Sequence, residues 1–282
     1  MNEQPLWIEL LGTTLSGAQT PDTGLIWTNL EGWTGLPEAR GDTDPIPGAH
    51  GSFKRKTILR QSRIITITGH IYATNTTELH TIRDNLETAL AAGAGTMRVS
   101  SRESGVWERY VEIDTLDVDP DRGRRWTKFV VDMVAPDPRR YGPLQRVGPV
   151  GMPVAAGGVR LPQRMPWNFG TVSEASRLIV PNAGAISMAP TLEVVGGFSQ
   201  VTIYEIATGR RLRFEWAVDD GDVVVFDCGA RRVTVGGADM TRWLRVREWF
   251  DIPAGQVGEF RFEVVGRVGD PLLSAFFRIG AW

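Results

Sequence analysis

Apolar and polar residues alternate along residues 107–118 and again along residues 124–134. Alternation with a period of two is typical of β-strands that bury one face. The residues between these stretches, 119–123, contain a proline and end in a glycine, which is the chemistry of a hairpin turn. The stretch RIITITGHI, residues 63–71, alternates in the same way and predicts a further strand.

One segment of the first half has helical periodicity instead. Asn75 is a natural N-cap, and Glu78 follows three residues later as in a capping box. Gly93 suits the position just after a helix, which predicts a helix over residues 76–92. Its apolar stripe consists of Leu79, Ile82, Leu86 and Leu90. We therefore expect an α+β first domain, with this helix packed on a β-structure.

The second half predicts short strands at regular spacing. Glycine-containing turns separate them, and no helical pattern intervenes. This arrangement favours a jelly-roll β-sandwich. The expected strands are residues 192–195, 201–205, 211–218, 223–227, 232–235, 243–250, 259–265 and 275–279.

The stretch APDPRRYG, residues 135–142, marks the boundary between the halves. Pro136 and Pro138 cannot donate ladder hydrogen bonds, so the preceding strand must end there. The following residues are rich in proline and glycine. We expect a first domain over residues 1–142, an extended connector over residues 143–170, and a second domain over residues 171–282.

Turn-forming residues dominate residues 12–51, which we expect to form a long loop. Trp27 and Trp33 lie within it. Tryptophan in a surface loop often marks an interface, and the alternative is that both side chains fold back onto their own domain. Residues 54–59 are expected to form a strand after this loop.

Composition excludes several classes of protein. The chain has 282 residues and a formal net charge of −2, with charge evenly spread, which does not fit a nucleic-acid binder. A single cysteine, Cys228, permits no intrachain disulfide. The N-terminus lacks the basic region of a secretory signal, and no apolar run approaches the ~20 residues of a membrane span. We expect synthesis in the cytoplasm.

No cluster of residues predicts catalysis, a cofactor or a metal. The spacing of Asp117, Asp119 and Asp121 resembles the start of a calcium loop. The required glycine comes one residue late, however, and Lys128 replaces the closing glutamate. A solvated hairpin tip is the favoured interpretation. The three histidines lack metal-ligand spacing, and no nucleophile motif is present. We therefore expect no enzymatic activity.

The stretch TRWLRVREWF, residues 241–250, combines aromatic and cationic side chains. Such a patch can bind either sugars or proteins. Sugar sites of the galectin type use a histidine, and residues 143–282 contain none, so a site of that type is excluded. The candidate ligand patch consists of Trp243, Arg245, Arg247 and Trp249.

Several motifs occur together in a characteristic order. They are RIITITGHI before TTELHTIRDNLETAL, then APDPRRYG, RLPQRMPWNFG, VPNAGAISMAPTLEVVG, TGRRLRFEWAVDDGDVVVFDCGARRVTVGG, REWFDIPAGQ and FFRIGAW. In this order the chain resembles the distal tail proteins of siphovirus-type bacteriophages, especially minor tail proteins of phages of actinobacteria. The resemblance covers residues 63–282.

The resemblance implies a belt domain related to tail-tube proteins, forming a homo-hexameric ring, and a galectin-like sandwich. Such a ring joins the tail tube to the tip hub at the distal end of the virion tail, and gives passage to the tape-measure protein and DNA. It implies assembly in the host cytoplasm, with no membrane span and no sequence-specific contact with nucleic acid. The alternative is a virion-associated carbohydrate-binding or receptor-binding module.

A head-to-tail ring requires two different complementary surfaces on each subunit. We expect one near residues 54–63 and the other on the hairpin of residues 111–131. The candidate interface residues are Trp27, Trp33, Lys54, Arg55, Asp119, Asp121 and Arg122.

Overall fold

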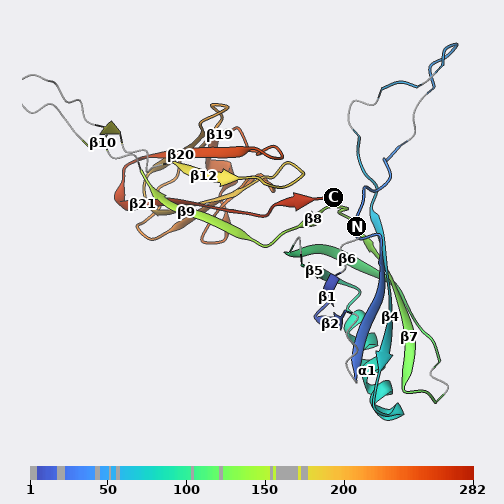
Figure 1. Ribbon diagram of the computed structural model, residues 1–282. Coiled ribbons are helices and arrows are strands. Elements are labelled where there is room, and N and C mark those ends of the chain that lie inside the picture. The colour runs from blue at the N-terminus through green and yellow to red at the C-terminus, as the bar shows by residue number, and fades with distance from the viewer. Residues whose placement is uncertain are drawn as a thin grey trace, which may run out of the picture. The chain divides into compact units, whose positions relative to one another are not determined.

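The computed structural model describes residues 5–17, 23–41, 45–50, 52–54, 58–102, 105–120, 123–152, 155–156, 171–172 and 177–282. The chain forms two compact units, Met1–Pro143 with Ala281–Trp282, and Leu144–Gly280 (Figure 1). The described residues are mainly β-strand, with one α-helix in the first unit. The predicted fold class, mainly β with a single helix in the N-terminal part, is confirmed.

Seven strands of the first unit form a closed ring of hydrogen-bonded neighbours. They are β6 (Gly105–Val118), β5 (Ala94–Ser101), β1 (Pro5–Leu10), β2 (Thr13–Ser16), β3 (Gly24–Glu31), β4 (Arg63–Tyr72) and β7 (Trp126–Ala135). The long strand β6 closes the ring, because its first part pairs with β5 and its last part with β7. The short strands β8 (Arg140–Tyr141) and β22 (Gly280–Ala281) extend the sheet beyond β6.

Alternating side chains of β4 fill the interior of this sheet. Ile65, Ile67 and Ile71 are fully buried, as the period-two pattern predicts. Gly69 takes the remaining inward position because a side chain would not fit there. A Cβ at Gly69 would lie 2.4 Å from the Phe129 ring and 2.4 Å from a backbone oxygen of β3.

Helix α1 (Thr76–Leu90) packs its apolar stripe on this core, with Leu79, Leu86 and Leu90 buried. Asn75 caps it, since its Oδ1 accepts a hydrogen bond from the Glu78 N–H at 2.8 Å. The Glu78 carboxylate accepts from the hydroxyl and the N–H of Thr74, and these two bonds lower its pKa. The helix ends two residues before the predicted boundary. No helix among the described residues has the length and hydrophobicity to cross a membrane.

The second unit is a sandwich of two antiparallel sheets. In chain order the first contains β12 (Leu178–Pro181), β14 (Gln200–Glu205), β15 (Arg211–Phe214), β19 (Leu244–Arg247) and β20 (Val257–Val265). The second contains β9 (Gln145–Gly151), β13 (Thr191–Gly197), β16 (Val223–Asp227), β17 (Arg232–Val235), β18 (Ala238–Asp239) and β21 (Val268–Phe277). Separately, β10 (Ala155–Ala156) pairs with β11 (Thr171–Val172).

The two sheets enclose a continuous apolar core. Phe214, Phe226, Phe260 and Phe262 are fully buried in it. Cys228 is also buried there, and this burial raises the pKa of its thiol to about 12. The predicted strands of the second half therefore meet in one sandwich, as their inward-facing alternate residues require.

Three predicted segments differ from the structure. Residues 145–151 of the expected connector form β9, which pairs with β21 at the edge of its sheet, where proline is tolerated. The expected loop over residues 12–51 contains β2 and β3, which complete the closed sheet. The described part of residues 54–59 contains no strand. Isolated bridges nearby join Ala39 with Arg60 and Pro45 with Ser52, and the Leu59 carbonyl accepts a hydrogen bond from the Arg40 N–H.

Candidate functional site

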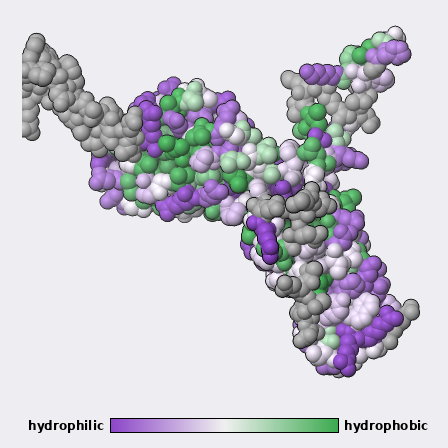
Figure 2. Space-filling model, in the orientation of Figure 1, coloured by the Kyte–Doolittle hydropathy of each residue, from purple (hydrophilic) through white to green (hydrophobic). Residues whose placement is uncertain are grey.

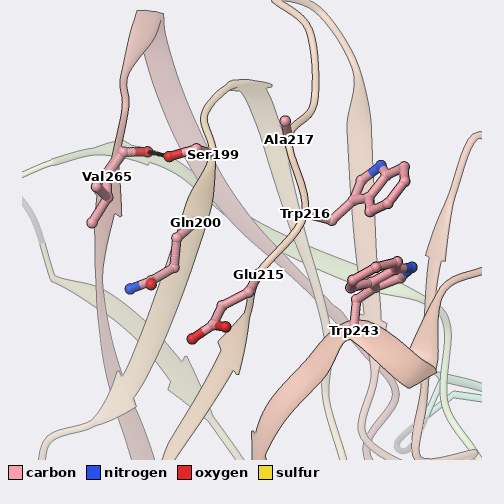
Figure 3. A pocket seen from close by; sticks show the side chains of 7 residues that line it. All are labelled: Ser199, Gln200, Glu215, Trp216, Ala217, Trp243 and Val265. Atoms are coloured by element: carbon pink, nitrogen blue, oxygen red, sulfur yellow. Dashed lines mark hydrogen bonds between the residues drawn. The ribbon is translucent and has the colours of Figure 1, made fainter.

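A pocket of about 430 Å³ lies at one end of the five-stranded sheet of the second unit. Its lining comprises Ser199, Gln200, Glu215, Trp216, Ala217, Trp243 and Val265 (Figure 3). Its volume is within the range typical of small-molecule sites.

The ends of neighbouring strands bring these residues together. Gln200 begins β14 and pairs with Val265 at the end of β20. Glu215 and Trp216 follow directly after β15. Trp243 ends the 3₁₀ turn η2 (Thr241–Trp243), and its carbonyl accepts a hydrogen bond from the Glu215 N–H at 3.0 Å. The pocket therefore depends on the sheet register, not on one contiguous motif.

Two tryptophan rings form one side of the pocket. The rings of Trp216 and Trp243 lie 4.6 Å apart between centroids, inclined by 42°. Trp216 is 38% exposed, whereas Trp243 is half-buried against the sandwich core. Gln200 and Glu215 lie on the other side of the pocket in Figure 3. The pocket thus combines aromatic rings on one side with hydrogen-bonding groups on the other.

Arginine side chains hold the carboxylate of this pocket. Nε of Arg213 lies 3.0 Å from one Glu215 oxygen, and Nε of Arg245 lies 3.3 Å from the other. The Arg245 guanidinium also lies over the Trp243 ring, 5.6 Å from its centroid. These partly exposed ion pairs contribute at most about 1 kcal/mol each to stability. They do, however, fix the Glu215 side chain and compensate its charge.

The first unit offers a second candidate surface, the arm, which we define as residues 32–41, 45–50, 52–54 and 58–62. Figure 1 shows this segment extending away from the closed sheet of its own unit. Four of its apolar side chains are 57–62% exposed, and hydrophobic residues are visible along it in Figure 2. They are Leu36, Phe53, Ile58 and Leu59. Exposed apolar surface of this kind marks an interaction site.

Buried arginines fix the base of the arm. Arg63 donates hydrogen bonds to three carbonyl groups of the arm, those of Gly32, Thr34 and Gly35, at 2.6–2.9 Å. Arg109 is 1% exposed and donates to the Trp33 carbonyl at 2.6 Å. Its guanidinium lies 4.5 Å from the centroid of the Trp33 ring. Burial lowers the pKa of Arg109 to about 9, and the neighbouring cations add to this shift.

The sequence of the second unit matches a known family. Residues 183–264 match the model described as the siphovirus-type tail component, C-terminal domain. The resemblance to siphovirus distal tail proteins is confirmed. No curated protein matches this sequence.

Solved structures of phage proteins have the same fold over nearly the whole chain. One is the Dit protein (gp 19.1) of phage SPP1, described as a paradigm of the hub adsorption apparatus in phages that infect Gram-positive bacteria. It is 12% identical, with a TM-score of 0.67 over 97% of this chain and 98% of that chain. A chain of the phage P2 baseplate in its activated conformation with Ca is 12% identical, with a TM-score of 0.54 over 100% and 99%.

These matches establish the fold and favour a structural role in the tail. The prediction of a galectin-like C-terminal sandwich is confirmed. None of these matches tests activity, so the absence of enzymatic activity stays a prediction. Among the residues that the structure describes, no group of three or more His, Cys, Asp or Glu side chains is placed to hold a metal ion.

The predicted ligand patch of the second unit is only partly assembled. Trp243 lines the pocket, and Arg245 holds its carboxylate. Arg247 instead donates to backbone carbonyls of Leu244 and Thr241, and Trp249 packs partly buried on the sandwich core. Sequence reasoning missed Trp216, although a tryptophan just after an alternating strand is a usable signal.

The structure places the predicted interface residues of the first unit in different environments. Trp27 and Trp33 are 5% and 6% exposed and belong to the core, so the expectation that they present free surface is wrong. Trp27 is buried because it lies on β3, a strand of the closed sheet, and Trp33 is buried at the base of the arm, where its ring packs against the Arg109 guanidinium. Lys54 and Asp119 are exposed. The other three, Arg55, Asp121 and Arg122, lie outside the described residues.

Proposed function

We propose that this protein is a structural component of the siphovirus tail tip, forming a hexameric ring that joins the tail tube to the tip hub. The observation that carries the proposal is the agreement of both units, over 97% of the chain, with the fold of a hub protein. The first unit, up to about residue 142, would form the ring, and the sandwich over residues 171–282 would lie at its periphery. The channel of the ring would give passage to the tape-measure protein and DNA.

The mixed surface charge supports passage of DNA without sequence-specific binding, because the formal net charge is only −2. The partners in this proposal are further copies of the chain, the tail tube protein, the hub protein and the tape-measure protein. The protein would occupy the distal end of the virion tail after assembly in the host cytoplasm.

The arm supplies one surface for the contact between neighbouring copies. Its exposed side chains Phe53, Ile58 and Leu59 are apolar, whereas its base is rigidly held by Arg63. A second surface is the pocket of about 280 Å³ near the turn between β6 and β7, where Asp119, Trp126 and other residues meet. In Figure 1 the arm and this turn lie at opposite ends of the first unit. Two different surfaces meet the requirement of a head-to-tail ring.

The mass of the purified protein tests the ring directly. We expect light scattering or native mass spectrometry to give six times the chain mass of 31.1 kDa, and averaged images to show a six-fold ring. Labelled antibody should mark the distal end of intact tails. A protein that stays monomeric at all concentrations, and that antibody fails to find on tails, would refute the proposal.

Polar substitutions in the arm should separate assembly from folding. The double variant Phe53→Ser, Ile58→Ser should raise the dissociation constant of the ring at least about tenfold, because both side chains would lose apolar contacts. Its melting temperature as a monomer should not change, since both side chains are more than half exposed.

Ile179→Ser is the matched control for the arm variants. Ile179 is equally apolar and about half exposed, but it lies on β12 of the sandwich. This variant should leave the ring intact. A double arm variant that assembles normally would show that the arm does not form the ring contact.

A further inference from the structure

We propose that the pocket of the second unit binds one pyranose residue of a neutral cell-surface glycan. This activity goes beyond the structural role proposed above. The pocket combines an exposed aromatic face with a fixed carboxylate and an amide (Figure 3).

The aromatic face is preorganised. Trp216 is more than one-third exposed, and Trp243 supports its ring at a centroid distance of 4.6 Å. The guanidinium of Arg242 lies 5.4 Å from the Trp243 centroid and that of Arg245 lies 5.6 Å from it. Trp216 therefore rests on a fixed support. The negative face of an aromatic ring attracts the weakly positive C–H groups on a flat face of a pyranose.

The polar groups suit hydroxyl groups. Each Glu215 oxygen has an arginine partner but keeps capacity to accept a further hydrogen bond from a sugar O–H. The Gln200 amide can donate and accept at once, and its side chain forms no hydrogen bond within the described part of the chain. Hydrogen-bond donors and acceptors beside an aromatic surface match a sugar ring that carries hydroxyls around its edge.

The charges select a neutral ligand. Arg213 and Arg245 already compensate the Glu215 carboxylate, so a cationic side chain of a peptide would gain little there. The lining contains no cation to anchor a phosphate or carboxylate ligand. The proposed mode of sugar binding also differs from that of sites that use a histidine, because residues 143–282 contain no histidine. A neutral, hydroxyl-rich ligand fits the pocket best.

Titration of the full-length protein tests this inference. The probes are methyl glycosides of glucose, galactose, mannose and N-acetylglucosamine, and soluble glycan released from the walls of a susceptible host. We expect saturation-transfer NMR to detect at least one of them, with a dissociation constant of about 1 mM for a single sugar. Trp216→Ala should weaken binding at least about tenfold, while Trp216→Phe should retain most of it.

The matched control is Tyr110→Ala, because Tyr110 is also an exposed aromatic residue, at 54%, but lies on β6 of the first unit. This variant should bind the same glycan unchanged. The inference is overturned if no probe binds, or if Trp216→Ala binds as well as the original protein. It is also overturned if Trp216→Ala abolishes binding of another tail protein but leaves binding of the glycan unchanged. Ring formation, measured separately, does not enter this test.

Discussion

Replacing Trp33 by alanine should lower the free energy of unfolding of the first unit by about 3–5 kcal/mol. The indole ring is 6% exposed, and the Arg109 guanidinium stacks on it at 4.5 Å. Its loss would leave a cavity and remove the aromatic face that stabilises a deeply buried cation. Hydrogen exchange of the amides of β5 and β6 reports the stability of this unit without interference from the sandwich.

Leu36→Ala is the control for this substitution. Leu36 lies three residues further along the arm and is 62% exposed, so its loss should change the free energy of unfolding by no more than about 0.5 kcal/mol. If Trp33→Ala left unfolding unchanged and weakened only ring assembly, Trp33 would be an interface anchor after all.

Local patterns predicted the elements that bury one face. The alternation in β4 and β7 predicted both strands, because each pairs along its full length with its inner residues in the core. Asn75 and Glu78 predicted where α1 begins, because the cap is a local hydrogen bond. The same reasoning missed β9, whose place depends on the distant strand β21.

The sites were harder to predict because they depend on pairing between distant segments. Trp243 was identifiable within its own strand-like stretch. Its partner Trp216 joins it only because β15 pairs with β19, with Phe214 opposite Leu244. The position of Trp33 depends on Arg109, far along the chain, whose buried side chain has no local signature. Without these distant contacts, the sequence around each tryptophan is compatible with a position either in the core or on the surface.

Asn182→Ala should lower the free energy of unfolding of the sandwich by about 3 kcal/mol or more. Asn182 is 1% exposed, and its Nδ2 lies 2.9–3.1 Å from the carbonyls of Ile186, Ile252 and Pro253. Its Oδ1 accepts from the Gly184 N–H at 3.0 Å. Each buried partner left unsatisfied costs about 1–3 kcal/mol. Denaturant unfolding followed by circular dichroism should show the loss.

This substitution also tests why two of the sequence motifs occur together. Asn182 belongs to VPNAGAISMAPTLEVVG, and two of its acceptors, Ile252 and Pro253, belong to REWFDIPAGQ. The side chain therefore joins the two motifs across the fold. Ser187→Ala is the local control, since its hydroxyl donates a single hydrogen bond to the Ile252 carbonyl, at 3.3 Å, and its loss should cost about 1 kcal/mol or less. Equal losses for the two variants would mean that the Asn182 network does not hold the motifs together, and that packing of the apolar residues around it does.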